Sequence, residues 1–334
     1  MFLVWVTSRR YLMKITQATQ GFLTFMKADG YSPSTVVLYD YVLKCLANFL
    51  EDMEVEKIKH NDLMRYFAYL RDGYEPTRKN GSDAPLSGST LQNHWKGIRT
   101  FFRWAEEDLE LKTRPDVKIK LPGKNPKVIL PFTEQEVKDL LKATEYTEVS
   151  PGNRKAYSMK RRTAERDLTI ILMLLDTGLR IGELCRLNFG DVDLETGDVY
   201  IAPYGNSNRK TKSRVVHIGK ATRRVLWRYL SNRIDKNSEE ALFLTESGIK
   251  RITTNSIRLL LADLGRKAGV NNCHPHRFRH TFCIEFLRNE GDLFNLQAIT
   301  GHANLEMLKN YVQIARSDSA KAHMRASPMD NWRL

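Results

Sequence analysis

The sequence predicts a mainly helical protein of two domains, with a small β-hairpin in the second. The chain has 334 residues, whereas one domain usually holds about 100–200. Apolar residues recur at helical spacing along most of the chain, and a single stretch has the pattern of two short strands. Residues 111–130 contain three prolines, one glycine and five lysines, a composition that interrupts regular structure. We therefore expect a small helical domain at 1–110, a linker at 111–130 and a mixed, mostly helical domain at 131–334.

Four helices are expected in the first domain. Residues 15–30 carry apolar side chains on one face and end at a glycine, which is a good stop signal. Ser32, beside a proline, is typical of the opening of a second helix, and Asn61 is expected to cap a third. Residues 71–87 are rich in glycine, proline and charge, which predicts a loop. The fourth helix is expected at 87–107.

The fourth helix places three cations on one face, because Lys96, Arg99 and Arg103 recur at steps of three and four residues. The whole chain has a net charge of +14 and a pI near 9.6. Lys and Arg neutralise phosphates and release counterions, so this excess favours a polyanionic partner such as nucleic acid. The alternative is a basic protein whose charged faces, this helix included, are only solvated.

The second domain is expected to open with a capping box at residues 133–136. A basic, interrupted stretch at 150–166 leads into an apolar run that predicts a buried helix, a turn at 177–178 and another helix from residue 179. β-branched residues on both sides of a polar turn predict a hairpin at 198–218. Further helices are expected at 220–234, 254–268, 280–289 and 305–314.

Cysteine spacing and hydropathy predict a soluble protein of the cytosol. The four cysteines are scattered without the CxxC spacing of a zinc site, which suits reduced thiols. The apolar run at the N-terminus has no charged region before it, and it is too short to span a bilayer. No later run reaches the length of about eighteen apolar residues that a membrane helix needs.

Two segments carry charges suited to binding a phosphate. Arg180 and Glu183 lie three residues apart, so they meet on one helical face, where the carboxylate would orient the guanidinium. A surface salt bridge has the same spacing. The tip of the hairpin carries Arg209, Lys210 and Lys212. A lysine there would reach a groove or protonate a leaving oxygen, although most charged turns are only solvated.

A third polar cluster lies near the C-terminus. His276, Arg279 and His280 are expected to place three or four cations, Arg277 included, at the start of a helix, where backbone N–H groups also favour an anion. The alternative is a capping histidine beside surface arginines. His302 follows a glycine and is expected to begin another helix, and Tyr311 lies nine positions later. A phenol has a pKa near 10, so it is a poor nucleophile unless neighbouring cations favour the phenolate.

In combination these segments resemble the tyrosine recombinase (phage integrase) family, in the order of that family and close to its spacings. The residues that carry the resemblance are Arg180 within TGLRIGEL, the lysines of the hairpin, His276-x-x-Arg279, Gly301-His302 and Tyr311. It covers about 130–315 as a catalytic domain and, more loosely, 15–107 as a helical core-type DNA-binding domain. The resemblance implies a simple two-domain enzyme without an arm-binding domain, which closes around duplex DNA as a C-shaped clamp.

The resemblance also implies a reaction. Tyr311 would attack a DNA phosphodiester and form a 3′-phosphotyrosyl enzyme with release of a 5′-hydroxyl. Arg180 and Arg279 would hold the non-bridging oxygens of the scissile phosphate. The bond energy is kept in the phosphotyrosine, so the family needs neither a metal nor another cofactor.

Supporting roles follow from the same resemblance. His276 and His302 would assist proton transfer and hydrogen bonding, and Glu183 would brace the site. Lys210 would be the general acid that protonates the leaving oxygen, with Lys212 as the alternative. Arg209 joins the three cations of the fourth helix as a candidate DNA contact. Thr300 stands where the family often has leucine, a departure expected to matter little.

The implied partners are double-stranded DNA and other copies of the chain, since the family acts as a tetramer on paired sites. Residues 315–334 are expected to pack on a neighbouring subunit, with Met324, Met329 and Trp332 as apolar anchors. The protein would be cytoplasmic, and associated with the nucleoid when bound to DNA. Its task would be integration or excision of a mobile element, or resolution.

Three alternatives remain open from the sequence. One is an enzyme that resembles type IB topoisomerases or forms DNA hairpins, with the same nucleophile chemistry. Another is a regulator that keeps the fold and binds DNA without cleaving it. The third is a basic structural protein of the nucleoid.

Overall fold

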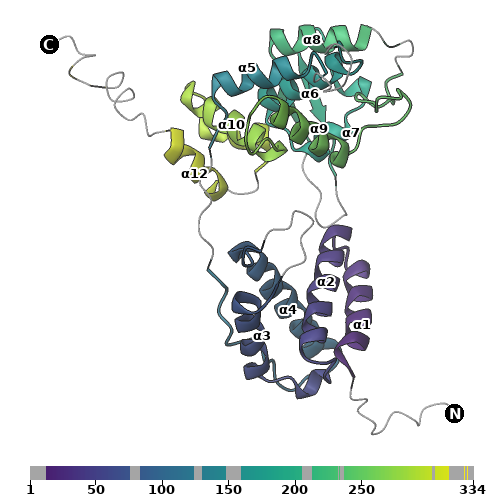
Figure 1. Ribbon diagram of the computed structural model, residues 1–334, viewed down its shortest axis with the longest axis vertical. Coiled ribbons are helices and arrows are strands. Elements are labelled where there is room, and N and C mark those ends of the chain that lie inside the picture. The colour runs from purple at the N-terminus through teal and green to yellow at the C-terminus, as the bar shows by residue number, and fades with distance from the viewer. Residues whose placement is uncertain are drawn as a thin grey trace, which may run out of the picture. The chain divides into compact units, whose positions relative to one another are not determined.

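The computed structural model divides into two compact units, one ending at residue 123 and the other beginning at residue 130 of its described part. The first unit contains helices α1 to α4, and the second contains α5 to α12 (Figure 1). The residues that the structure describes are 13–75, 83–123, 130–147, 159–204, 213–231, 233, 237–302, 305–315, 327 and 329.

The first unit is a helical bundle. Its helices are α1 (Ile15–Ala28), α2 (Pro33–Phe49), α3 (His60–Asp72) and α4 (Gly88–Asp108), with a short 3-10 helix, η1 (Val55–Lys57), before α3. The amphipathic helices bury one face each, and α2 packs against both α1 and α4 (Figure 1). Phe22 lies at the centre of the core, with its ring centroid 5.6 Å from that of Phe101 and 5.5 Å from that of Trp104.

Most of the helix openings in this unit are those that the sequence predicts. Ser32 and Ser87 cap α2 and α4, and each side chain accepts a hydrogen bond from a backbone N–H of the first turn. The predicted cap at Asn61 is wrong, because α3 begins at His60 and Asn61 lies inside the helix. The N-cap is Lys59, and the carboxylate of Asp62 accepts a hydrogen bond from its backbone N–H at 2.9 Å.

Much of the expected linker packs on the first unit. Leu111 and Ile119 are buried in its core. The indole N–H of Trp95 donates to the carbonyl of Ile119 at 2.9 Å, and the side chain of Gln92 donates to the carbonyl of Pro122 at 2.8 Å. The prolines prevent helix and strand here, but the apolar residues between them still bury. The remaining part, 124–129, lies outside the described residues.

The second unit surrounds one buried helix, α6, which packs against α8 and α10 (Figure 1). Its only described sheet is an antiparallel pair in which Asp198 lies opposite His217, so the predicted hairpin is present, with its tip outside the described residues. The elements of this unit are α5 (Glu134–Ala143), α6 (Ala164–Thr177), α7 (Ile181–Arg186), η2 (Phe189–Asp191), β1 (Asp198–Ile201), β2 (Arg214–His217), α8 (Lys220–Ser231), α9 (Thr254–Lys267), α10 (Pro275–Arg288), α11 (Leu293–Thr300) and α12 (Glu306–Ala315). None of the helices, within the described part of the chain, is long and apolar enough to cross a membrane.

Local chemistry explains the ends of these elements. Thr133 and Glu136 form the predicted capping box, since the hydroxyl accepts from the Glu136 N–H at 3.2 Å and the carboxylate accepts from the Thr133 N–H at 2.8 Å. Helix α6 ends at Gly178, whose φ of 60° is the left-handed conformation that glycine adopts readily. A Cβ at this position would meet the ring of Phe282.

Two predictions near the C-terminus are wrong. Helix α10 begins at Pro275 and not at residue 280, because His274 caps it and proline suits the first helical position. Helix α11 was not expected, and Asp292 caps it by accepting from the N–H groups of Phe294 and Asn295. Gly301 therefore ends a helix, with φ of 63°, and does not begin one.

Candidate active site and DNA-binding surface

The candidate active site lies in the second unit, where five short segments meet. Arg180 follows the turn between α6 and α7, and Arg214 begins β2. Helix α10 contributes His276, Arg279 and His280, the end of α11 contributes Thr300 to His302, and α12 contributes Tyr311.

Glu183 is buried between two arginines. Its side chain is 4% exposed. It accepts from the backbone N–H of Arg180 at 2.9 Å and from Nη1 of Arg180 at 3.2 Å. Arg214 donates two more hydrogen bonds to it, at 3.1 and 2.7 Å. Burial would raise the pKa of the Glu183 carboxyl, but these bonds lower it, so the carboxylate stays charged. The Arg180–Glu183 pair thus has a buried carboxylate, which sets it apart from a salt bridge in which both side chains are exposed.

Arg214 was not among the predicted site residues. Its Nε donates to the carbonyl of Ile299 at 2.7 Å, so it connects β2 both to Glu183 and to the end of α11. In the sequence Arg214 is one of several cations around the hairpin turn. It differs from the others only in belonging to the alternating pattern that predicts the strand β2. That pattern does not reveal which element its side chain contacts.

Arg279 is a buried cation held by the backbone. Its Nη1 donates to the carbonyl of Gly178 at 2.7 Å, and its Nη2 donates to the carbonyl of Thr300 at 2.7 Å. Burial lowers its pKa to about 10, with Arg180 contributing in the same direction, so it remains charged at neutral pH. Arg180 binds the next carbonyl after that of Thr300, since the carbonyl of Gly301 accepts from its Nη2 at 3.2 Å. The last carbonyls of a helix favour cations, and here they hold both arginines together.

The hydrogen bonds of His302 fix its tautomer. The Thr300 hydroxyl donates to the carbonyl of Leu296 at 2.5 Å, so it must accept from Nδ1–H of His302, at 2.7 Å. The other ring nitrogen, Nε2, accepts from Nη2 of Arg279 at 3.1 Å. Burial and the neighbouring arginines lower the pKa of His302 to about 4. His302 is therefore a neutral bridge between α11 and Arg279.

Tyr311 is 5% exposed, and its hydroxyl lies 2.6 Å from Nδ1 of His280. Burial raises the pKa of the phenol to about 12, and the charge of Arg279 opposes this only partly. The neighbouring cations therefore do not favour the phenolate in this arrangement, because desolvation outweighs the attraction. His276 is exposed at the surface, and its ring centroid is 6.3 Å from that of His280. Partial desolvation of its ring and the nearby arginines lower its pKa.

The expected cluster of cations in α10 is also wrong. Burial lowers the pKa of His280 to about 4, so this histidine is neutral. Arg277 points to another part of the unit, where it pairs with Glu136 at 2.8 Å and lies over the ring of Phe132. Arg279 is the one residue of this run that brings a charge into the site.

The structure thus brings together most of the predicted site and adds one residue to it. Arg180, Glu183, Arg279 and His302 are joined directly or through Thr300 and Gly301. Tyr311 packs beside His302, with ring centroids 6.2 Å apart. The addition is Arg214. His280 was expected only as one of the cations of its segment, and the structure places it against the phenol of Tyr311 instead. Arg209, Lys210 and Lys212 lie outside the described residues.

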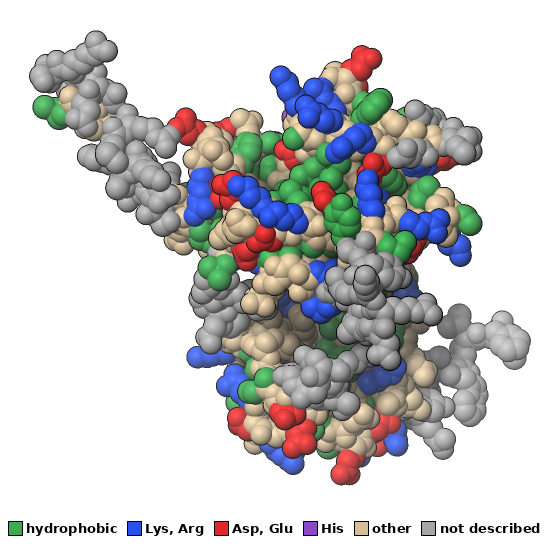
Figure 2. Space-filling model, turned by 45° about the horizontal axis from the view of Figure 1, so that its top comes forward, with side chains coloured by type: hydrophobic (Ala, Val, Ile, Leu, Met, Phe, Trp, Pro, Cys, Tyr) green, Lys and Arg blue, Asp and Glu red, His purple; other side chains and the backbone are tan. Residues whose placement is uncertain are grey.

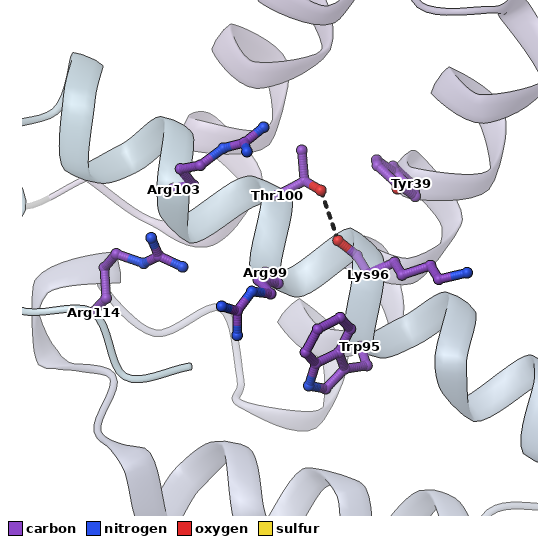
Figure 3. Close-up of a pocket in the computed structure, with 7 residues that line it drawn as sticks. All are labelled: Tyr39, Trp95, Lys96, Arg99, Thr100, Arg103 and Arg114. Atoms are coloured by element: carbon purple, nitrogen blue, oxygen red, sulfur yellow. Dashed lines mark hydrogen bonds between the residues drawn. The ribbon is translucent and has the colours of Figure 1, made fainter. Parts of the chain in front are cut away.

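The predicted basic face of α4 lines a hollow of about 250 Å³ in the first unit (Figure 3). Lys96 and Arg103 are exposed, and neither forms an ion pair with a described acidic side chain. The guanidinium of Arg99 lies 5.0 Å from the ring centroid of Trp95, a cation–π arrangement. The seven residues that line the hollow are Tyr39, Trp95, Lys96, Arg99, Thr100, Arg103 and Arg114.

These features are those of a surface for a polyanion. Arg114, at the edge of the hollow, pairs with Asp116 at 2.7 Å, so the other three cations remain to bind an incoming phosphate. Lys and Arg side chains are also exposed on both units (Figure 2). Within the described residues, no group of His, Cys, Asp and Glu is arranged to hold a metal ion.

Comparison with known proteins agrees with this arrangement. Residues 131–317 match the phage integrase family, and residues 19–112 match the N-terminal SAM-like domain of phage integrases. The chain is 28% identical over 316 residues to tyrosine recombinase XerC of Staphylococcus epidermidis, which covers 92% of this chain and 96% of the relative. It is 29% identical over 313 residues to tyrosine recombinase XerA of Thermococcus kodakarensis, covering 93% and 95%.

Solved structures share the fold. The integrase of transposon Tn1549, in complex with a circular intermediate DNA, matches with a TM-score of 0.69 at 21% identity, over 94% of this chain and 99% of that one. The XerH site-specific recombinase bound to its difH substrate matches with a TM-score of 0.65 at 18% identity, over 96% and 85%.

Proposed function

This chain belongs to the phage integrase family and is a tyrosine recombinase, and we propose that it cleaves and rejoins DNA at specific sites through a 3′-phosphotyrosyl intermediate. One observation carries the proposal. The phenol of Tyr311 lies beside His302, which accepts a hydrogen bond from the buried Arg279. Arg279 and Arg180 also donate to the neighbouring carbonyls of Thr300 and Gly301. A nucleophile and two fixed guanidiniums are what in-line attack on a phosphodiester needs.

In the proposed reaction the Tyr311 oxygen forms a bond to phosphorus, and the bond from phosphorus to the 5′-oxygen breaks. Arg180, whose side chain is 37% exposed, meets the phosphate first. Arg279 uses one N–H of Nη1 and both of Nη2 for described partners. Its Nε–H and second Nη1–H remain to bind a non-bridging oxygen.

The other predicted residues take supporting roles in this proposal. Lys210 protonates the leaving 5′-oxygen, with Lys212 as its alternative. His276 is exposed beside Arg279 on α10, where it would hydrogen-bond to the phosphate. Glu183 and His302 keep the two arginines in place. When the 5′-hydroxyl of another strand attacks the phosphotyrosine, the same groups act in reverse and the strands are exchanged.

DNA binding is proposed for both units. We assign residues 1–110 to a core-type DNA-binding domain and residues 131–334 to the catalytic domain. The exposed cations of α4 contact the DNA backbone, because they face solvent without acidic partners among the described residues. Arg209, on the hairpin, adds a further contact. The protein would act in the cytoplasm, on DNA of the nucleoid, in integration, excision or resolution.

We also propose a homotetramer on paired sites, in which residues 315–334 of one subunit pack on the next. A hollow of about 960 Å³ in the second unit supports this, since Phe132, Phe282 and Phe286 are among the residues that line it. Met324, Met329 and Trp332 would supply apolar side chains to fill it. Deletion of 318–334 should abolish assembly on paired sites while single-site binding remains. Unchanged assembly of the shortened protein would refute this part.

The function is tested with DNA substrates nicked near candidate sites, so that cleavage releases a short fragment and traps the covalent complex. Wild type should give a protein–DNA band on a denaturing gel, and Tyr311→Phe should give none. A band that survives in Tyr311→Phe would place the nucleophile elsewhere. Tight, specific binding with no band in either protein would indicate a regulator that does not cleave.

A further inference from the structure

The hydroxyl of Tyr311 has one hydrogen-bond partner among the described residues, and that partner is His280. Nδ1 of His280 lies 2.6 Å from the phenol oxygen, and the two ring centroids are 5.5 Å apart. The residues belong to α10 and α12, which pack against each other (Figure 1). The nucleophile therefore lies in direct contact with a group that has no role in the function proposed above.

The other histidines of the site do not offer the same contact. Both ring nitrogens of His302 are occupied, one by the Thr300 hydroxyl and the other by Arg279. His276 is exposed, and no hydrogen bond joins it to Tyr311. Within the part of the chain that the structure describes, only His280 places a basic nitrogen on the phenol.

We propose that His280 is a catalytic residue that accepts the phenolic proton of Tyr311 as the phenol attacks the scissile phosphate. The inference rests on the proposed function. With its own proton on Nε2, His280 has a lone pair on Nδ1 for the phenol. As the bond from the Tyr311 oxygen to phosphorus forms, the phenolic proton passes to Nδ1. The bond to the 5′-oxygen breaks, and that oxygen takes a proton from Lys210 or Lys212.

The rejoining step balances in the same way. The attacking 5′-hydroxyl returns its proton to the lysine amine and forms a bond to phosphorus. The bond from phosphorus to Tyr311 breaks, and Nδ1 of His280 returns the proton to the phenol oxygen. Neither step needs a group that the proposed reaction does not already contain.

The electrostatics of the pair decide when the proton moves. Burial lowers the pKa of His280 to about 4, and His276 and Arg279 on the same helix and His274 at its N-cap act in the same direction. The phenol on α12 has a pKa of about 12. A gap of about eight units (12 − 4) means that the proton does not move beforehand. It moves with formation of the bond to phosphorus, when the phosphate brings negative charge beside His280 and raises its proton affinity.

Two other roles for the same hydrogen bond make different predictions. If His280 only positions the phenol, an acceptor that cannot take up a proton would serve equally well. If it restrains Tyr311 in a buried position, removal of the bond would speed the attack. Single-turnover rates of covalent complex formation on the nicked substrate distinguish these roles.

His280→Asn places an amide oxygen near the position of Nδ1, whereas His280→Phe removes the acceptor. Both substitutions should slow covalent complex formation by about 100-fold or more, the usual effect of losing a general base. A rate for His280→Asn close to wild type would establish a positioning role, and a faster rate for His280→Phe would establish a restraint. Either result overturns the proposal. His217→Asn, at a side chain that is 68% exposed on β2, is the matched control and should react at the wild-type rate.

A more acidic phenol should remove the need for the base. Incorporation of a fluorinated tyrosine at position 311 should therefore accelerate His280→Asn by about tenfold or more, with much less effect in the protein that keeps His280. Equal effects in both proteins would rule out proton transfer to His280. Far-ultraviolet circular dichroism and DNA affinity establish that each variant is folded. Absence of a covalent band in wild type itself would refute the proposed function, and this inference with it. A normal wild-type band with unaffected His280 variants would refute only the inference.

Discussion

Arg214 donates two hydrogen bonds to the carboxylate of Glu183, from Nη2 at 2.7 Å and from Nη1 at 3.1 Å. The two side chains are 9% and 4% exposed, so the pair is buried. The third hydrogen bond of Arg214, to the carbonyl of Ile299, fixes the end of α11 from which Gly301 and His302 continue. The Arg214 side chain thus connects the hairpin to Glu183, which binds Arg180, and to the end of α11, which precedes His302.

Replacement of Arg214 by Met should destabilise the protein and slow cleavage. Loss of one partner of a buried ion pair leaves a charge without compensation, which costs about 3–5 kcal/mol. Arg180 still donates hydrogen bonds to Glu183, so the loss of unfolding free energy should lie near the lower limit of this range. Urea unfolding measures the stability, and the nicked substrate measures the cleavage rate. Lys138→Met is the control, because its pair with Glu134 is exposed and screened by solvent, so its loss should change the stability little. Equal losses in the two variants would contradict the buried role of Arg214.

The contrast between Arg180 and Arg214 shows which contacts the sequence reveals. Arg180 and Glu183 are three residues apart, so the helical period alone brings them together. Arg214 and Glu183 are 31 residues apart, and their contact depends on how the hairpin docks on α7. The family resemblance named Tyr311, Arg180, Arg279 and the bracing Glu183 as candidates, but it did not name Arg214.

Neither helix α11 nor the protonation states of Tyr311 and His302 could be predicted from the sequence, because both depend on which residues are buried. Phe294 is 71% exposed, whereas Leu296 is buried, so the apolar residues of α11 form no continuous stripe that a periodicity argument would detect. The pKa values of Tyr311 and His302 depend on burial, which residue types do not reveal. The number of cations near the phenol therefore does not indicate the direction in which its pKa shifts.

The hydroxyl of Thr300 should matter for cleavage, contrary to the expectation from the sequence. Replacement by Val keeps the shape but leaves Nδ1–H of His302 without its acceptor, a loss of about 1–3 kcal/mol for a buried donor. The tautomer of His302 is then no longer fixed, and its bond from Arg279 weakens. We expect covalent complex formation to slow by about tenfold in Thr300→Val. Thr300→Ser keeps the hydroxyl and should stay close to wild type. Equal rates for the Val and Ser variants would show that the hydroxyl has no role.

The cations of α4 should determine how strongly DNA binding depends on salt. Each phosphate contact contributes about −0.9 to the slope of log affinity against log salt concentration on duplex DNA. Replacement of Lys96, Arg99 and Arg103 together by Gln should therefore make the slope less steep by about two to three units. Fluorescence anisotropy over a series of salt concentrations measures it. Arg65→Gln, at a side chain that is 75% exposed on α3, is the control for general loss of charge. A similar change of slope in both variants would remove α4 as a specific contact surface.

Stability of the first unit should fall as the pH drops below about 6.5, because of His94. This side chain is 2% exposed, and its Nδ1 lies 2.9 Å from the hydroxyl of Tyr66. Burial lowers its pKa to about 4 from the model-compound value of 6.5. The unfolded chain therefore binds a proton at a higher pH than the folded chain. The contribution of His94 is fully present above pH 6.5 and is lost as the pH falls towards 4.

The slope of unfolding free energy against pH tests this, since one such histidine contributes at most about 1.4 kcal/mol per pH unit. His94→Asn keeps a polar atom near the position of Nδ1 but does not titrate, so its slope should be shallower than that of wild type. Urea unfolding can be followed through Trp95 and Trp104 of α4 once the other three of the five tryptophans are replaced by Phe. His302→Asn removes a histidine of the second unit and should leave this signal unchanged. Parallel slopes for wild type and His94→Asn would mean that His94 gains a proton as readily in the folded chain as in the unfolded one.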